Sequence, residues 1–592
     1  MHQSDIAVSA KVNNASLFLQ DNKSGATSFE YSILSNHIEF GDVFTYQGKK
    51  YVPEFFYGHE LHKLKMYGKI EFVFVENQLL SQYFTIKNLF AKLDRYPHVF
   101  HDFNAKLRLY ENDLHIDRFD GMLDASDFHI TGKLGNYKLL ASNKKQGDAR
   151  LNFSIQSNQL QLKDLFSYNG KNYVPEEYQA ESFSSFATKG YVQMNYVQDS
   201  LLTTDLHIDA MQGSFSMHPL KMERFSADLS FKQNQIDIKK IVGLLEENDF
   251  AISGHWFTNT TDQSKAKRSN IQFASRNLNM ESLLSYEEPQ AGATVDHDSG
   301  FNLFTVPFPN LDLQLNIGRL QYHKYQLQQL RAQVRLKENH FIYFDQLSML
   351  AASGAIRMTG YLNGSDPQHI YFNPTLNIRG VKLDEVMYKM DNFGQDMLVS
   401  DNLRGTFSGL IKGKILLHAD LTPKLDESDL EMQVLVEDGR LEKFQPMFAL
   451  SDFFGDKNLS RIVFDKLENK LVLKNGLLYL PNMVINSSLG FMQLSGKQGL
   501  DMQMEYYMRV PLRMVTGAAM QKLFGRKSEE IDPEREDEII YKDPKRRVSY
   551  INIKIAGTPD NYKISLQRNK EQKKKDPNDK IELTAFEDLE EM

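Results

Sequence analysis

The chain has 592 residues and a formal net charge of −8. It contains 16 histidines and 23 methionines but no cysteine. Its length excludes a single hydrophobic core, because such cores stop growing near about 250–300 residues. The missing cysteines exclude disulfide scaffolds and thiolate metal sites. Basic residues do not gather into the stripe that a phosphate backbone requires, which argues against a nucleic-acid partner.

The N-terminal segment, MHQSDIAVSAKVNNASLFL, lacks the basic region and the continuous apolar stretch of a secretory signal. No apolar run reaches the roughly 18 residues of a membrane-spanning helix. If the protein works outside the cytoplasm, we therefore expect its export element and its membrane anchor to be supplied elsewhere. Either this chain is a fragment, or the anchor is another subunit.

An internal repeat organises the chain. The segment FTYQGKKYVPEFF from Phe44 matches FSYNGKNYVPEEY from Phe166, an offset of 166 − 44 = 122 residues. The same offset, 225 − 103, aligns a longer block from Phe103 with one from Phe225. Two separated blocks that share one offset indicate an array of similar units.

Later copies are shorter and more diverged. A third copy includes segments from Ser275 and Leu330, and a partial fourth includes segments from Val381 and Phe464. We predict repeat units over 1–150, 151–270 and 271–375, a C-terminal region over 376–567, and a charged disordered tail over 568–592.

Apolar and polar residues alternate within each unit, which is typical of strands with one apolar and one wet face. Polar turns such as Glu111-Asn112-Asp113 and Gln233-Asn234 separate the runs and indicate antiparallel hairpins. The segments LKDLFSY and MESLLSY predict short helices. The predicted fold class is mainly β: an elongated, repetitive antiparallel sheet folded lengthwise into a groove, with short helices at unit edges and a C-terminal amphipathic helix.

The continuous apolar face is the feature with functional promise. A unit this thin must stack or fold over, and two interpretations remain open: a closed sandwich core, or a sheet that curls without closing and leaves a trough for acyl chains. Flexible methionines near residue 504 favour the trough, since they tolerate irregular ligands. The lipid-groove candidates are Leu107, Leu109, Ile116, Leu229, Phe231, Ile238, Val334, Leu336, Leu471, Leu473, Met502, Met504, Tyr506 and Met508.

The segment PLRMVTGAAMQKLFGRK from Pro511 predicts the C-terminal amphipathic helix. Such a helix can lie on a membrane surface or cap the trough, and packing on the adjacent sheet is an equal alternative. Its apolar membrane or cap candidates are Leu512, Val515, Met520, Leu523 and Phe524.

Residues suited to catalysis or metal binding do not form a recognisable motif. His59-Glu60-Leu61-His62 places its histidines three residues apart, whereas the metalloprotease helix needs four, and we predict a surface loop there and around His98 and His101. For Asp124 and Asp127 we predict a turn role, because Asp readily bonds nearby backbone. We predict no catalytic residue, metal or cofactor, and therefore no enzyme.

The last third carries a family resemblance. DGRLEKFQPMFALSDFF from Asp438, the strand pair ending LSGKQGLDMQMEYYMRVPL, and IAGTPDNYKISL from Ile555 resemble the C-terminal region of the AsmA-like family. The upstream array is similar to the rest of that family, so the resemblance covers nearly the whole chain. It implies a periplasmic protein, associated with the inner membrane, whose β-groove serves lipid traffic and outer-membrane assembly. This chain departs from the family by lacking the N-terminal anchor.

We therefore hypothesise a non-enzymatic envelope protein whose apolar groove binds phospholipid or another envelope lipid and supports lipid transfer or outer-membrane assembly, with a membrane and envelope proteins as partners. The alternative is a structural or interaction scaffold for outer-membrane biogenesis that acts through exposed sheet edges without conducting lipid. A carbohydrate-active enzyme is disfavoured, because acidic residues do not cluster at matching strand positions.

Overall fold

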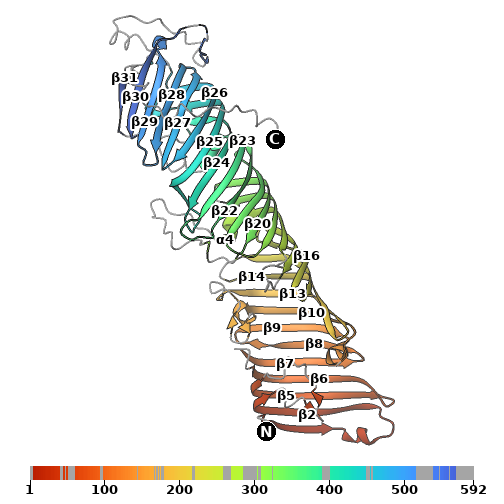
Figure 1. Cartoon of the computed structure of the whole chain (residues 1–592). Helices are drawn as coiled ribbons and strands as arrows, with labels where there is room; N and C mark the ends of the chain where they lie inside the picture. The colour runs from red at the N-terminus through yellow and green to blue at the C-terminus, as the bar shows by residue number, and fades with distance from the viewer. Residues whose placement is uncertain are drawn as a thin grey trace. The chain divides into compact units, whose positions relative to one another are not determined.

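The computed structural model confirms a mainly β protein with antiparallel sheets and short helices (Figure 1). The chain divides into two units, 1–287 and 288–592. The structure describes residues 4–39, 45–46, 49–50, 60–93, 98–142, 144–165, 167–168, 171–172, 174, 179–216, 220–257, 268–284, 303–304, 308–322, 324–389, 400–448, 454, 458–514, 538–543, 545, 547–558 and 561–567.

In unit 1, strands that follow one another in the chain pair side by side as successive rungs (Figure 1). In spatial order they are β1 (Ala7–Asn13), β2 (Gly25–Glu39), β5 (Glu60–Val75), β6 (Gln78–Leu93), β7 (Val99–Tyr110), β8 (Asp113–Leu123), β9 (Ser126–Gly135), β10 (Gly147–Gln161), β13 (Ser182–Val197), β14 (Ser200–Phe215), β15 (Lys221–Lys232), β16 (Gln235–Leu245), β17 (Asn248–Phe257) and β18 (Ser269–Asn279).

Two small hairpins reproduce the 122-residue repeat in the structure. The strands β3 (Thr45–Tyr46) and β4 (Lys49–Lys50) pair with each other, as do β11 (Ser167–Tyr168) and β12 (Lys171–Asn172). The polar segments expected between strands also form turns. Between β5 and β6, for example, Glu76 and Asn77 have φ angles of 46° and 68°, which suit a two-residue hairpin turn that follows the strand twist.

Unit 2 continues the same consecutive antiparallel pairing within itself. Its strands are β19 (Leu311–Tyr322), β20 (Tyr325–Lys337), β21 (Phe341–Ala351), β22 (Gly354–Asn363), β23 (Tyr371–Lys382), β24 (Leu403–Leu417), β25 (Pro423–Glu442), β26 (Arg461–Lys474), β27 (Leu477–Ser487), β28 (Gly490–Gly499), β29 (Met504–Pro511), β30 (Tyr550–Thr558) and β31 (Asn561–Gln567).

Short helices interrupt the strands. Those expected at LKDLFSY and MESLLSY are present as α3 (Leu162–Leu165) and α4 (Met280–Leu284). The others are η1 (Ala15–Leu19), α2 (Tyr137–Ala141), α5 (Leu383–Lys389), α6 (Gln445–Phe448) and η6 (Leu512–Met514). Residues 515–537 and the tail 568–592 lie outside the described residues, so the C-terminal amphipathic helix stays a prediction.

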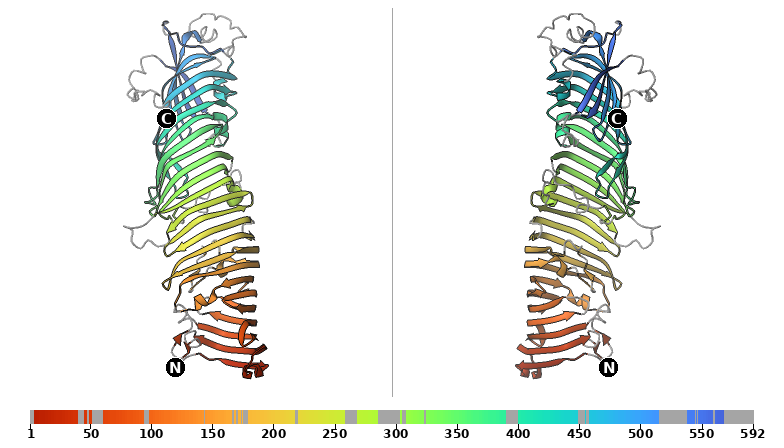
Figure 2. Two further views of the ribbon diagram at one scale, coloured as in Figure 1. Left: turned by 90° about the vertical axis from the view of Figure 1, so that its right-hand side faces the viewer. Right: turned by 90° about the vertical axis from the view of Figure 1, so that its left-hand side faces the viewer.

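Bulges recur in the strands of unit 1. Lys63, Asn88, Asp102 and Arg224 have φ angles of 56°, 52°, 55° and 51° inside strands, and each lies at a shift in the register with the next strand. An extra residue on one strand bends it and increases its twist. The bulges therefore give these long strands the curvature visible in Figure 2.

Candidate functional site

A row of apolar residues crosses the sheet of unit 1 from strand to strand. Residues directly opposite each other in an antiparallel pair lie on the same face, so the register defines the row without reference to side-chain detail. Its members are Phe29, Ile70, Phe84, Leu107, Ile116, Gly132, Phe153, Gly190, Ile208, Ala227, Ile241, Ile252 and Phe273.

A second apolar row lies beside the first, two residues along each strand except β16, where a register shift makes the spacing three residues. It consists of Leu109, Leu114, Leu134, Leu151, Val192, Leu206, Leu229, Ile238, Gly254 and Ile271. Phe231 belongs to a shorter third row, opposite Ile236. The structure thus brings all six groove candidates of unit 1 onto one apolar face.

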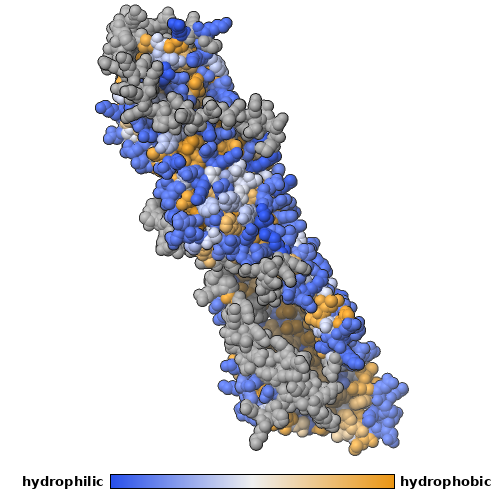
Figure 3. Space-filling view, in the orientation of Figure 1, coloured by the Kyte–Doolittle hydropathy of each residue, from blue (hydrophilic) through white to orange (hydrophobic). Residues whose placement is uncertain are grey.

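The large side chains of these rows are mostly half-buried. Leu107, Phe153 and Leu206 are neither exposed nor fully covered, whereas the small Ala227 is only 4% exposed. Their intermediate exposure distinguishes them from the fully buried side chains of a closed core. Figure 3 shows apolar side chains gathered in a hollow of unit 1.

The opposite face of unit 1 is polar. The register aligns His115, Lys133, Asn152, Tyr191 and His207 across five strands. Lys133 forms an ion pair with Asp113 at 2.6 Å, and the rings of Tyr191 and His207 stack with centroids 4.9 Å apart. Exposed ion pairs add little stability, but they identify this as the face that water covers.

Unit 2 carries apolar rows of its own. One row comprises Leu315, Ala332, Leu347, Met358, Leu376, Ile411, Met432 and the predicted Leu471. Val334 lies between Leu313 and Phe344, Leu336 lies between Leu311 and Ile342, and Leu473 lies between Leu430 and Leu478. Part of this face is covered: Leu303, Leu362 and Ile370 form a buried cluster.

The last strands of unit 2 pack into a filled core. Phe454, Leu459, Ile462, Leu489, Met492, Met508, Val510, Met514 and Ile553 are all buried together. The burial of Met508 fits the closed-core alternative. Met504 is 7% exposed, and burial raises the pKa of Tyr506.

Two other C-terminal candidates lie outside strands. Met502 lies in the turn between β28 and β29 with a φ of 66°, so it does not continue the alternation of Met504. Leu512 lies in η6 and is half-buried. Val515, Met520, Leu523 and Phe524 lie outside the described residues.

The predicted surface loops at the histidines are wrong for the residues that the structure describes. Glu60 and His62 begin β5, while His59 lies outside the described part of the chain. His98 is 7% exposed, and its Nδ1 lies 2.5 Å from Asp124 Oδ2. His101 lies within β7.

Asp127 bonds the neighbouring strand instead of its own turn. Its carboxylate accepts hydrogen bonds from the backbone N–H groups of Asn158 and Gln159 at 2.9 and 2.7 Å. Burial acts to raise the pKa of Asp127, but these hydrogen bonds outweigh it, and the pKa is lowered. Asp5 and Asp249 make the same contacts in their own copies of the repeat. The role is structural.

The fold and the site define a mainly β protein whose long antiparallel sheets each present an apolar face. Comparison with family models, with curated proteins and with solved structures finds no match for this chain. Among the described residues, no helix is both long enough and apolar enough to cross a bilayer.

Proposed function

We propose that the apolar face of unit 1 is the wall of a groove that binds the acyl chains of phospholipid or another envelope lipid. One observation carries the proposal: apolar rows continue across the strands of this unit, and their large side chains stay half-buried in the protein alone. Apolar faces of this extent mark interaction or ligand sites when they are left uncovered.

The physical mechanism is passive. Moving an acyl chain from water onto an apolar wall is favourable by about 0.8 kcal/mol per methylene group. Leucine, isoleucine, valine and phenylalanine supply that wall without any specific polar contact. Because each strand adds a similar set of residues, neighbouring positions along the rows have similar affinity, and a lipid can shift between them at small cost.

The cellular role in this proposal follows the AsmA-like resemblance. A periplasmic protein associated with the inner membrane would use the groove in lipid transfer or outer-membrane assembly, without enzymatic chemistry. Phospholipid, a membrane and envelope proteins are the proposed partners. Polar headgroups would remain in water at the groove's rim.

A scaffold role is the second candidate, favoured by the edge of the sheet. Among the described strands, β1 pairs with β2 alone, and its Val8 and Val12 are 62% and 42% exposed. An exposed strand edge can pair with a strand of another protein. A scaffold of this kind would bind protein partners and would not retain lipid.

The test uses two neighbouring residues of β10 that point to opposite faces. Leu151 belongs to the apolar row and Asn152 to the polar face. We expect lipid extracted from the purified chain, measured by mass spectrometry, to fall more than about tenfold in Leu151→Arg, because a charge on an apolar wall is costly. Asn152→Arg should retain lipid at the wild-type level.

Circular dichroism separates loss of binding from loss of folding, because both variants should keep the β signal. Equal lipid content in Leu151→Arg and Asn152→Arg, with both variants folded, would contradict the groove. It would leave the scaffold as the better account.

A further inference from the structure

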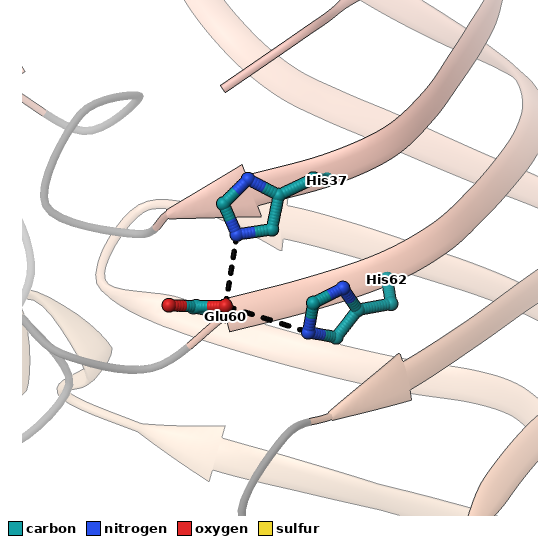
Figure 4. Close-up of side chains that lie close together, drawn as sticks. All are labelled: His37, Glu60 and His62. Atoms are coloured by element: carbon teal, nitrogen blue, oxygen red, sulfur yellow. Dashed lines mark hydrogen bonds and ion pairs between the residues drawn. The ribbon is translucent and has the colours of Figure 1, made fainter. Parts of the chain in front are cut away.

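Three potential metal ligands converge on the paired strands β2 and β5. His37 lies directly opposite His62 in the register, and Glu60 precedes His62 by two residues, so that on a strand both side chains share a face. His37 Nε2 lies 2.9 Å and His62 Nε2 lies 3.4 Å from the same oxygen, Glu60 Oε2. Figure 4 shows the three side chains pointing toward one another.

We propose that His37, Glu60 and His62 bind a divalent transition-metal ion, with Zn²⁺ as the ion that the donor set fits best. Two imidazole nitrogens and one carboxylate oxygen, with a fourth position left open, are a common ligand set for Zn²⁺. Ligands about 2.0–2.1 Å from a tetrahedral ion lie roughly 3.3 Å apart. The spacings to Glu60 Oε2 are already close to that value, so little movement is needed.

The exposure of the three side chains suits an exchangeable ion. The side chains of His37, Glu60 and His62 are 21%, 40% and 38% exposed. An ion can therefore enter from solvent, and its fourth position can hold water or an external ligand. The two imidazole rings lie with centroids 5.1 Å apart and an interplanar angle of 30°, an arrangement that two rings facing one ion can keep.

The second copy of the repeat shows that the fold does not need these ligands. Adding the offset of 122 residues to 37, 60 and 62 gives Gln159, Ser182 and Ser184. Gln159 lies opposite Ser184 in β10 and β13, just as His37 lies opposite His62. The same backbone pairing thus forms around residues that are poor metal ligands.

The backbone at His37 is held in the same way as at Gln159. Asp5 Oδ1 accepts the N–H of His37 at 2.8 Å, and Asp127 Oδ1 accepts the N–H of Gln159 at 2.7 Å. The shared contact places His37 before any ion binds. The histidines and the glutamate are therefore an addition to the repeat and not part of what folds it.

A second cluster of potential metal ligands is the alternative site that the experiment must distinguish. His98, Asp124 and Asp164 also bring ligand atoms within 4.8 Å of one another, but His98 Nδ1 already bonds Asp124, and Asp164 accepts a hydrogen bond from Ser126 Oγ at 2.6 Å. This cluster offers one imidazole in place of two, and His98 and Asp164 are only 7% and 1% exposed, so an ion reaches it less readily from solvent than it reaches the partly exposed first cluster. We therefore assign the ion to His37, Glu60 and His62.

The test is a Zn²⁺ titration of the whole chain by calorimetry after chelator treatment. The wild type should bind one ion at this site. His37→Gln and His62→Ser, which install the residues of the second repeat, should each weaken binding by more than about tenfold, since each removes a ligand. The matched control is His129→Gln, because His129 faces a single carboxylate, Asp120, and its removal should leave affinity unchanged.

Two further readouts keep the result independent of folding. Zn²⁺ should raise the melting temperature of the wild type and of His129→Gln but not of His62→Ser, while the metal-free proteins melt alike. Co²⁺ in place of Zn²⁺ should give visible absorption bands that His62→Ser lacks. Undiminished Zn²⁺ affinity in His37→Gln and His62→Ser would overturn the site, as would a loss seen only in His98→Asn.

Discussion

The apolar face of unit 1 and the C-terminal core of unit 2 are built from the same alternating pattern but end in different states. In unit 1 the rows through Leu151 and Leu206 leave large side chains half-buried. In unit 2 the last strands enclose Leu489 and Ile553, each 1% exposed. Alternation therefore decides which face is apolar, and what lies above that face decides whether it is a core or a surface.

The largest effect on stability is expected in the core. Leu489→Ala should lower the free energy of unfolding by about 2–5 kcal/mol, because it leaves a cavity among buried neighbours. Leu206→Ala should cost only about 1–2 kcal/mol, since its side chain is half-exposed already. Urea unfolding followed by circular dichroism measures both. Equal costs would show that the face of unit 1 is sealed like the core.

A smaller effect on stability is expected from the aspartates that accept hydrogen bonds from the backbone of a neighbouring strand in each repeat. Asp127→Ala should cost about 1–3 kcal/mol near neutral pH, because it leaves the backbone N–H groups of Asn158 and Gln159 without their acceptor. The exposed Asp117, 3.6 Å from Arg108, is the matched control, and Asp117→Ala should cost almost nothing.

The pH dependence of the Asp127 effect has a definite sign. Folding lowers the pKa of Asp127, so its stabilisation is present above the unfolded value near about 3.9 and is lost as the pH falls through the folded pKa. The difference in stability between the wild type and Asp127→Ala should therefore shrink below about pH 4. If the difference in stability stays constant in acid, the ionised carboxylate of Asp127 is not what stabilises the fold.

Much of the fold was accessible to sequence analysis because its signals are local. Period-two alternation predicted the strands around Leu107 and Leu229, and the matching blocks from Phe44 and Phe166 predicted the repeat. The turn at Gln233-Asn234 was predicted correctly, since φ at Gln233 is 35° and a hairpin follows. These features depend on residues near one another in the chain.

The remaining features depend on which residues of neighbouring strands lie opposite each other, and this register cannot be predicted from any short segment of the sequence. His37 and Glu60 are 23 residues apart and meet only because β2 and β5 pair with His37 opposite His62. The same holds for His98 and Asp124, which are 26 residues apart. The spacing Glu-x-His on a strand was an available signal for two of the cluster's three residues. It was missed because the segment was compared only with the helical metalloprotease motif. The methionine run around Met508 favoured a trough in the sequence, whereas the structure places Met508 in a buried cluster.

The most direct measurement of the central claim uses the absence of cysteine, which permits single labels. Leu206 and His207 are consecutive in β14 (Ser200–Phe215), with Leu206 on the apolar row and His207 on the polar face. A fluorophore on Leu206→Cys should be quenched by lipid carrying a brominated acyl chain, and one on His207→Cys should not. Equal quenching at the two positions, or none at Leu206→Cys, would contradict a lipid-binding face.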